Sequence, residues 1–141
     1  MQPKLIALAT AAMVWCVTLA AQENENDIVG VWNSPNKDSR VVIYKENNLY
    51  YGKVVWGSGT QTKDEENPDV TLRNRDLTGL VILKHFTYDG KGVFLDGTIY
   101  DPHNGQTYSC KMTLKNTYQL LIRGYLGISL FGRTEIWTKQ N

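Results

Sequence analysis

The sequence is poor in cysteine, histidine and proline, and neither sign of charge predominates. Its 141 residues include two cysteines, two histidines and four prolines, and 15 basic residues against 14 acidic ones give a formal net charge of +1. This balance disfavours a nucleic-acid partner, which selects a basic surface, and disfavours docking to a membrane through a polybasic segment. With 42% hydrophobic and 21% charged residues, the composition is typical of one globular domain rather than a disordered chain.

A secretory signal peptide is predicted over residues 1–21. Lys4 precedes a run without charge over 5–20, and the run ends in the small residues Ala20 and Ala21. A short cationic start, an apolar middle and a small-residue exit are the features of such a leader. A transmembrane helix needs about 20 apolar residues, so a retained membrane anchor is the less favoured alternative.

Cleavage after Ala20 or Ala21 would remove Cys16 and leave Cys110 as the one cysteine of a single domain over 22–141. A lone cysteine cannot form an internal disulfide, so the hydrophobic core must hold this domain together. We expect the protein to be exported, either to the periplasm or out of the cell, with no membrane span after cleavage.

Beyond residue 27, hydrophobic residues alternate with polar ones, which predicts strands rather than helices. These segments are rich in Val, Ile, Tyr, Thr and Trp, and turn pairs such as Asp89-Gly90 and Asn104-Gly105 separate them. The expected strands are 28–34, 39–45, 49–56, 80–88, 92–101, 106–114, 117–125 and 133–139.

One long polar segment, 57–79, interrupts this pattern. Asn67 suits a helix N-cap, and Pro68 and Asp69 suit the first turn, so we predict one short helix of about two turns there. Strands joined by hairpins must hide their edges, which favours an all-β, eight-stranded up-and-down antiparallel barrel over an open sandwich. The interior of such a barrel either is filled by side chains or holds one small ligand.

The first and last strands each carry a feature with a parallel in known proteins. Gly30-Val31-Trp32 opens the first strand and Arg133 begins the last. This combination resembles the calycin superfamily of lipocalin-type barrels, in which the tryptophan packs across the barrel floor against a late arginine. The resemblance implies that Trp32 and Arg133 form a structural floor.

A second resemblance rests on motifs spread over the chain. They are Gly30-Val31-Trp32, Gly52-Lys53-Val54-Val55-Trp56, Asn67-Pro68-Asp69, Leu72-Arg73-Asn74-Arg75, and the stretches 77–83, 97–102, 105–108 and 122–134 with Trp137. Together they are similar to the exported bacterial family known as domain of unknown function 2147. The resemblance implies an exported, lipocalin-like barrel without an assigned activity. Many relatives carry a cysteine pair near the positions of Asn47 and Tyr51. This chain lacks the pair, so any role of a disulfide in those relatives does not apply to it.

Signals for catalysis and for metal binding are weak. His85, His103 and Cys110 lack the spacing of a zinc site, and no G-x-S-x-G nucleophile elbow occurs. Asp101 reads as a turn residue and Glu135 as an ion-pair partner rather than as an acid–base pair, although a hydrolase with paired carboxylates is a third interpretation. We therefore expect a protein that is not an enzyme and that needs no metal and no cofactor.

Arginines and aromatic residues concentrate in the family-like segments. A wet barrel mouth holding such residues would suit a small anionic, amphipathic or sugar-like ligand, through bidentate donors and stacking. The candidate ligand-binding residues are Trp56, Arg73, Arg75, Tyr100, Tyr108 and Arg123. For Arg73, Arg75 and Arg123 a structural role is the alternative, in which Arg73 and Arg75 fix the short helix to the barrel rim.

The stretch 125–132 is apolar for a connector between strands. It is a lid on the cavity, a contact in a homodimer, or a plug folded back into the barrel. The function favoured by the sequence is a lipocalin-like binding protein whose ligand enters between 57–79 and 125–132. The alternative is an interaction protein of the cell envelope whose barrel is filled by its own side chains and holds no ligand.

Overall fold

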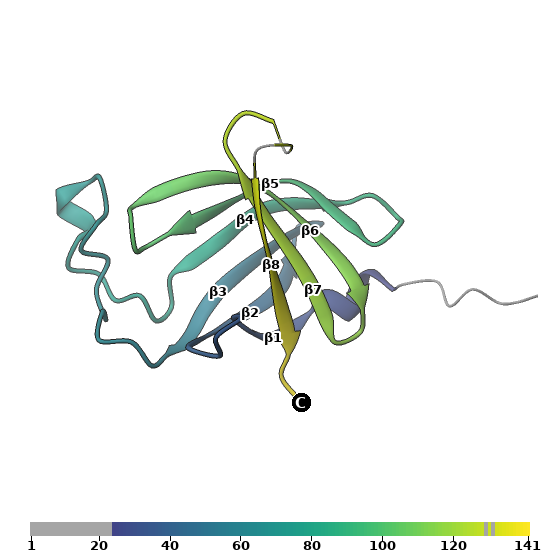
Figure 1. Cartoon of the computed structure of the whole chain (residues 1–141), viewed down its shortest axis with the longest axis horizontal. Helices are drawn as coiled ribbons and strands as arrows, with labels where there is room; N and C mark the ends of the chain where they lie inside the picture. The colour runs from purple at the N-terminus through teal and green to yellow at the C-terminus, as the bar shows by residue number, and fades with distance from the viewer. Residues whose placement is uncertain (1–23, 129, 131) are drawn as a thin grey trace, which may run out of the picture.

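Eight strands close into one antiparallel barrel in the computed structural model, which describes residues 24–128, 130 and 132–141 (Figure 1). The strands are β1 Gly30–Asn33, β2 Ser39–Glu46, β3 Leu49–Gly57, β4 Val81–Tyr88, β5 Val93–Asp101, β6 Gln106–Asn116, β7 Gln119–Tyr125 and β8 Gly132–Lys139. Each strand pairs with the next, and β1 closes the barrel by pairing with β8. The predicted barrel is confirmed. The predicted leader, 1–21, lies outside the described residues.

The described ranges contain no α-helix, and their named helical elements are two short 3-10 turns, η1 Glu25–Ile28 and η2 Val70–Leu72. The prediction of a two-turn helix capped by Asn67 is wrong, because η2 is three residues long and Asp69 caps it through a bond from the backbone N–H of Thr71. Asn67 is buried and uses its side chain elsewhere, as described below. No helix in the described part of the chain is long and apolar enough to cross a membrane.

Paired irregularities bend β4 and β5. His85 and Asp96 adopt positive φ angles of 65° and 62° within these strands, and the β5–β6 register shifts between Phe94 and Gly97. A Cβ atom at Gly97 would lie 2.4 Å from the Phe86 ring, so only glycine allows that ring to pack against the bent backbone. The bends let large aromatic residues fill the interior of a narrow barrel.

The core lies inside the barrel and extends to the end that η1 covers (Figure 1). Its fully buried large side chains include Ile28, Trp32, Ile43, Tyr50, Leu83, Phe86, Phe94, Met112 and Leu120. Tyr50 and Phe94 meet edge to face, with ring centroids 4.8 Å apart. Because η1 contributes Ile28 to this core, the N-terminal turn acts as the floor of the barrel.

Trp32 contacts the other residues that form the floor. Its indole Nε1 donates to the carbonyl of Ile28 at 2.7 Å. The Nζ of Lys139 lies 5.5 Å from the centroid of the Trp32 ring and donates to the carbonyl of Asp27 at 2.6 Å. Trp32 therefore joins the first strand, the last strand and η1 through one aromatic ring.

The cation at the floor is Lys139, whereas the sequence predicts Arg133. β8 runs antiparallel to β1, and the register places Trp32 opposite Lys139, at the end of β8. Arg133 lies at the start of β8, opposite Gly124, and therefore at the other end of the barrel. Its side chain is 86% exposed and pairs with Glu135 at 3.2 Å. Trp32 keeps its predicted place in the floor, and Arg133 does not belong to it.

Replacing Trp32 with alanine should lower the free energy of unfolding by about 4 kcal/mol, since it opens a large cavity and removes the donor to Ile28. Urea denaturation followed by circular dichroism measures this loss. Trp56→Ala is the matched control, because Trp56 is partly exposed and its removal should cost less than about 1 kcal/mol. Equal losses in the two variants would contradict the floor role of Trp32.

Candidate functional site

Side chains of β4, β5 and β6 alternate between the barrel interior and its outer face. Leu83 and Ile99 are opposite each other in the register and pack with the core. The adjacent pair, Lys84 and Thr98, therefore points outward. The pair formed by Tyr100 and Thr107 continues the same outward face onto β6.

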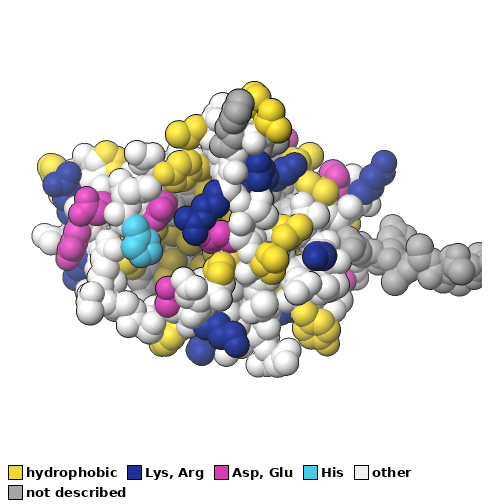
Figure 2. Space-filling view, in the orientation of Figure 1, with side chains coloured by type: hydrophobic (Ala, Val, Ile, Leu, Met, Phe, Trp, Pro, Cys, Tyr) yellow, Lys and Arg dark blue, Asp and Glu magenta, His cyan; other side chains and the backbone are white. Residues whose placement is uncertain are grey.

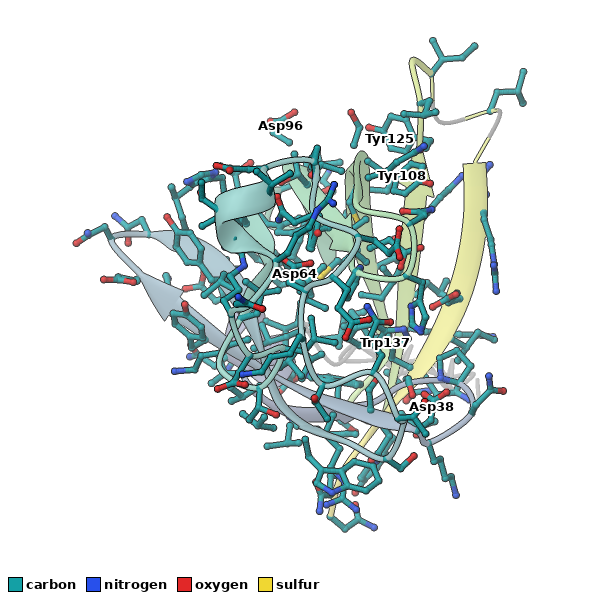
Figure 3. All side chains as sticks on the ribbon, turned by 90° about the vertical axis from the view of Figure 1, so that its left-hand side faces the viewer. Asp38, Asp64, Asp96, Tyr108, Tyr125 and Trp137 are labelled. Atoms are coloured by element: carbon teal, nitrogen blue, oxygen red, sulfur yellow. The ribbon has the colours of Figure 1, made fainter. Side chains whose placement is uncertain are left out.

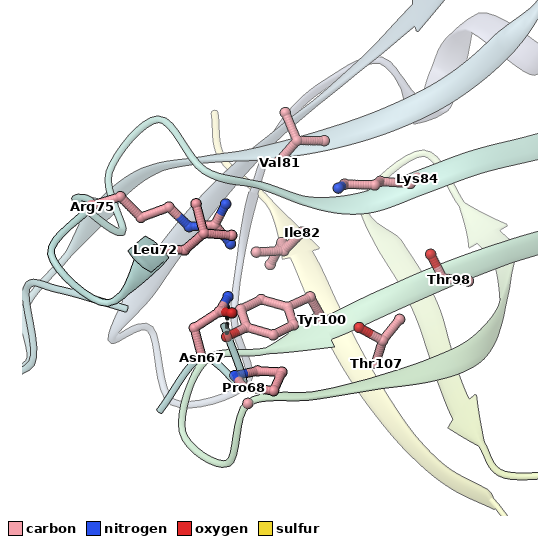
Figure 4. Close-up of a pocket in the computed structure, with 11 residues that line it drawn as sticks. Asn67, Pro68, Leu72, Arg75, Val81, Ile82, Lys84, Thr98, Tyr100 and Thr107 are labelled. Atoms are coloured by element: carbon pink, nitrogen blue, oxygen red, sulfur yellow. Dashed lines mark hydrogen bonds between the residues drawn. The ribbon is translucent and has the colours of Figure 1, made fainter. Parts of the chain in front are cut away.

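The connection between β3 and β4, residues 58–80, lies against this outer face; we call it the β3–β4 segment. A pocket of about 290 Å³ lies between the two and is named the outer pocket (Figure 4). Its lining residues are Asn67, Pro68, Leu72, Arg75, Val81, Ile82, Lys84, Thr98, Tyr100, Gly105 and Thr107. The pocket therefore lies outside the barrel, between a long connection and the sheet.

A fully buried carboxylate, Asp64, holds the β3–β4 segment on the sheet. Its Oδ1 accepts from the Tyr100 hydroxyl at 2.5 Å. Its Oδ2 accepts from Asn67 Nδ2 at 2.8 Å and from the guanidinium of Arg75, at 2.8 Å from Nε and 2.7 Å from the second nitrogen. A buried charge is tolerated only when its oxygens are paired in this way. The three partners tie the segment to itself and to β5.

Burial opposes ionisation of Asp64 and by itself raises its pKa, but the hydrogen bonds from Tyr100, Asn67 and Arg75 and the charge of Arg75 outweigh it. The pKa of Asp64 is therefore held below its ordinary value, and the group is a carboxylate at neutral pH. Burial and the bond to this carboxylate raise the pKa of Tyr100 to about 12. Tyr100 is thus a neutral donor under physiological conditions.

Further contacts fix the ends of the β3–β4 segment. Gln61 Nε2 donates to the carbonyl of Pro102, in the β5–β6 turn, at 3.0 Å. In the same turn, Gly105 has a φ of 71°, and a Cβ atom there would lie 1.9 Å from the carbonyl oxygen of Glu66. Only glycine allows so close an approach of the two backbones. The wall of the outer pocket is therefore held by close packing as well as by Asp64.

The outer pocket combines an apolar wall with donor groups. Leu72, Val81 and Ile82 supply aliphatic surface, with Pro68 beside them. Lys84 lies at the opposite side, as Figure 4 shows, and has no ion-pair partner among the described residues. The hydroxyls of Thr98 and Thr107 line the same side. An unpaired cation facing an apolar wall favours a ligand that has both an anionic group and an apolar part.

The structure brings together only part of the predicted ligand-binding set. Arg75 and Tyr100 both line the outer pocket, although each is also engaged by Asp64. Arg73 lies on the same segment and its Nε donates to the carbonyl of Asn67 at 2.8 Å, which is a contact within the segment and not with the barrel rim. The ligand-binding role of these residues stays a prediction.

The other three predicted residues lie elsewhere. Trp56 stacks under the guanidinium of Arg40, 4.5 Å from the ring centroid. Arg123 donates to the hydroxyl of Thr134 at 2.8 Å across the β7–β8 pair. Tyr108 accepts from Asn104 and donates to Gln106 at the start of β6. The six predicted residues therefore do not line a single mouth of the barrel.

Sequence reasoning missed Asp64, Lys84 and Thr98. Asp64 is one of several acidic residues in a polar segment, and nothing local distinguishes it from its exposed neighbour Glu65. Lys84 and Thr98 look like ordinary outward positions of separate strands, and only the β4–β5 register makes them neighbours.

At the open end, the barrel interior is lined by half-buried residues. Ile99, Tyr108 and Gly124 lie side by side on three strands, and a Cβ atom at Gly124 would lie 3.4 Å from Ile99. Figure 2 shows a hollow with hydrophobic side chains at its base and charged side chains at its edge. Figure 3 shows Tyr108 and Tyr125 beside each other on β6 and β7, apart from Asp64. The residues at this end of the barrel are a second, smaller set of candidate ligand contacts.

The described residues contain no group of three or more side chains suited to hold a metal ion. His103 contacts Asp101 at 3.2 Å in an exposed turn, and His85 packs edge-on against Tyr51. Cys110 is buried in the core, where burial raises the pKa of its thiol to about 12. It is packed as a small hydrophobic residue rather than as a nucleophile.

A closed, eight-stranded up-and-down barrel is the architecture of lipocalin-like proteins. Residues 30–139 match the bacterial family described as "Uncharacterized protein conserved in bacteria (DUF2147)", and the chain belongs to this family. Among solved structures it is similar to protein HP1028 of Helicobacter pylori, which is described as a member of the lipocalin family. The identity is 24%, over 81% of this chain and 83% of that one, with a TM-score of 0.74, which establishes the fold alone. No curated protein matches. The predicted family and its lipocalin-like fold are confirmed.

Replacing Asp64 with alanine should reduce the free energy of unfolding by about 3 kcal/mol, because Arg75, Tyr100 and Asn67 all lose their acceptor. Asp69→Ala is the control, since it removes only an exposed cap and should cost clearly less than Asp64→Ala. Urea denaturation at pH 7 compares the two variants. A loss in Asp64→Ala no larger than that in Asp69→Ala would show that the anchor is dispensable.

The Asp64 contribution should also depend on pH. A carboxylate whose pKa is lower in the folded than in the unfolded chain stabilises the fold above the unfolded pKa of about 3.9, and this contribution disappears as the pH falls through the folded pKa. The difference in unfolding free energy between the wild type and Asp64→Ala should therefore shrink below about pH 4. A difference that is the same at pH 3 and pH 7 would contradict this assignment.

Cys110 should not react with a thiol reagent such as dithionitrobenzoate at pH 8 while the protein is folded, because the thiol is buried and its pKa is about 12. In urea the thiol should react fully within the mixing time. Rapid modification of the native protein would show that the barrel wall opens at β6.

Proposed function

We propose that this protein is an exported lipocalin-like binding protein that holds a small amphipathic anion in the outer pocket. The observation that carries the proposal is that Lys84, which has no ion-pair partner among the described residues, faces an aliphatic wall in a cavity of about 290 Å³. Pockets for small molecules begin at about 300 Å³ and are mostly apolar with a few placed polar groups. The predicted signal peptide supports export.

The two sides of the outer pocket would contact different parts of the ligand. A carboxylate, sulfonate or phosphate of the ligand would accept from Lys84 and from the hydroxyl of Thr98 or Thr107. The apolar part would pack against Leu72 and Ile82. Asp64 contributes indirectly, because it holds the wall of the pocket in place before a ligand arrives, which reduces the ordering cost of binding.

This proposal moves the expected site from the barrel mouth to the outer face. The interior is occupied by fully buried aromatic residues such as Tyr50, Phe86 and Phe94. The mouth offers Tyr108 as an aromatic contact, whereas Arg75 and Tyr100 line the outer pocket. We infer binding rather than catalysis, because the buried carboxylate, Asp64, is engaged by three donors.

The second candidate function is an interaction protein of the cell envelope that holds no ligand. The packed aromatic core favours it, because a barrel filled by its own side chains is a stable scaffold without a guest. Under this alternative the outer pocket is only the seam between the β3–β4 segment and the sheet.

The outer pocket can be tested with anilinonaphthalene sulfonate, a fluorescent probe with an apolar ring system and one anionic group. Lys84→Gln should raise the dissociation constant of the probe about fivefold to tenfold, since it removes a charge-assisted bond at a partly exposed site. Lys91→Gln, in the exposed β4–β5 turn, is the matched control and should leave the constant unchanged. Fluorescence titration of the folded protein at pH 7 provides the measurement.

Two further variants separate the possible positions of the probe. Tyr108→Ala should not alter the affinity for the probe if the probe occupies the outer pocket. Leu126→Ser should also leave the affinity unchanged, which would exclude adsorption of the probe to the exposed β7–β8 loop. Loss of binding in Tyr108→Ala with unchanged binding in Lys84→Gln would place the ligand in the mouth instead. No saturable binding by the wild type, together with no co-purifying small molecule in native mass spectrometry, would favour the scaffold alternative.

A further inference from the structure

The described residues of the loop between β7 and β8, 126–128 and 130, present an apolar tip to solvent. Leu126 is 62% exposed, Ile128 59% and Leu130 75%. The sequence has no charged residue between Arg123 and Arg133. Figure 1 shows that the loop rises above the end of β8, clear of the barrel. Exposed aliphatic side chains at one tip mark a contact surface rather than a connector.

The apolar side chains of Leu126, Ile128 and Leu130 face solvent and do not plug the barrel. Residues 129 and 131 lie outside the described residues, so a plug formed by them stays a prediction. Gly127 has a φ of 74°, and a Cβ atom there would find no neighbour within 4 Å. The space beside Gly127 is therefore open. An exposed apolar tip suits insertion into a partner that can close around it.

Cations surround the base of the tip. Arg123 donates to the carbonyl of Leu130 at 3.3 Å and to Thr134 at 2.8 Å, which fixes its guanidinium beside the loop. Lys111 is opposite Arg123 in the β6–β7 register. Arg133, the second residue of β8, has a side chain that is 86% exposed and pairs with Glu135. Figure 2 shows Lys and Arg side chains directly beneath the apolar tip. An apolar tip above a cationic base has the charge and shape of an interfacial anchor.

We propose that the β7–β8 loop docks the protein on a lipid bilayer that contains anionic headgroups. Leu126, Ile128 and Leu130 enter the boundary between headgroups and acyl chains, and Arg123 and Arg133 lie at the level of the phosphates. The attachment is peripheral and reversible, since one short loop inserts rather than a spanning segment. This inference does not rest on the outer pocket, which lies on β4, β5 and β6.

The test is co-sedimentation of the purified protein with vesicles of phosphatidylcholine containing 30% phosphatidylglycerol, compared with phosphatidylcholine alone. We expect binding to the anionic vesicles that weakens at high salt, because exposed charges are screened. Leu126→Ser with Leu130→Ser should reduce the bound fraction at least tenfold. Tyr118→Ser is the matched control, since Tyr118 is 61% exposed but lies in the β6–β7 turn, at the other end of β7, and should bind like the wild type.

A second pair of variants tests the cationic base. Arg133→Gln should weaken binding to anionic vesicles severalfold, whereas Lys115→Gln, near the far end of β6, should not. Lys84→Gln should bind vesicles normally, which separates this inference from the proposed function. Any one of three results would overturn the membrane-docking inference. The first is no sedimentation with either vesicle, and the second is sedimentation that the double serine variant retains. The third is a dimer in sedimentation velocity that the double serine variant abolishes, because a second copy would then cover the tip.

Discussion

A charge removed from water has to be compensated, and this requirement organises one side of the molecule around Asp64. Its carboxylate is fully buried and receives bonds from Tyr100 on β5 and from Asn67 and Arg75 within the β3–β4 segment. A connection of this length would otherwise lose much conformational entropy for few contacts. The strong, directional bonds to one anion offset that loss and give the segment a single position.

The outer pocket follows from this anchor. The segment brings Leu72 and Pro68 over a strip of sheet that carries Ile82, Lys84 and Thr98. Neither surface forms the cavity alone, since the lining residues come from both the β3–β4 segment and the strands. Aliphatic surface, two hydroxyls and a cation thus meet in a place where an antiparallel sheet of this kind is often bare to solvent.

The two ends of the barrel have different chemistry. At one end η1 and Lys139 cover Trp32, and the aromatic core fills the interior beside them. At the other end the connections are longer, and one of them presents an apolar tip over Arg123. A rigid, closed floor and a chemically varied rim are what allow one barrel fold to serve different ligands and partners.

Alternation of hydrophobic residues and the turn pairs determined the strands, because strand periodicity and tight-turn conformation are local properties of the chain. The place of Trp32 in the floor was implied by the resemblance of Gly30-Val31-Trp32 to the calycin superfamily, not by this alternation. The partner of Trp32, the neighbours of Lys84 and the burial of Asp64 were decided only by the tertiary structure. Each of these depends on the register between strands or on which of several acidic residues meets Tyr100. Such contacts join positions far apart in the chain, and no local pattern of residues specifies them.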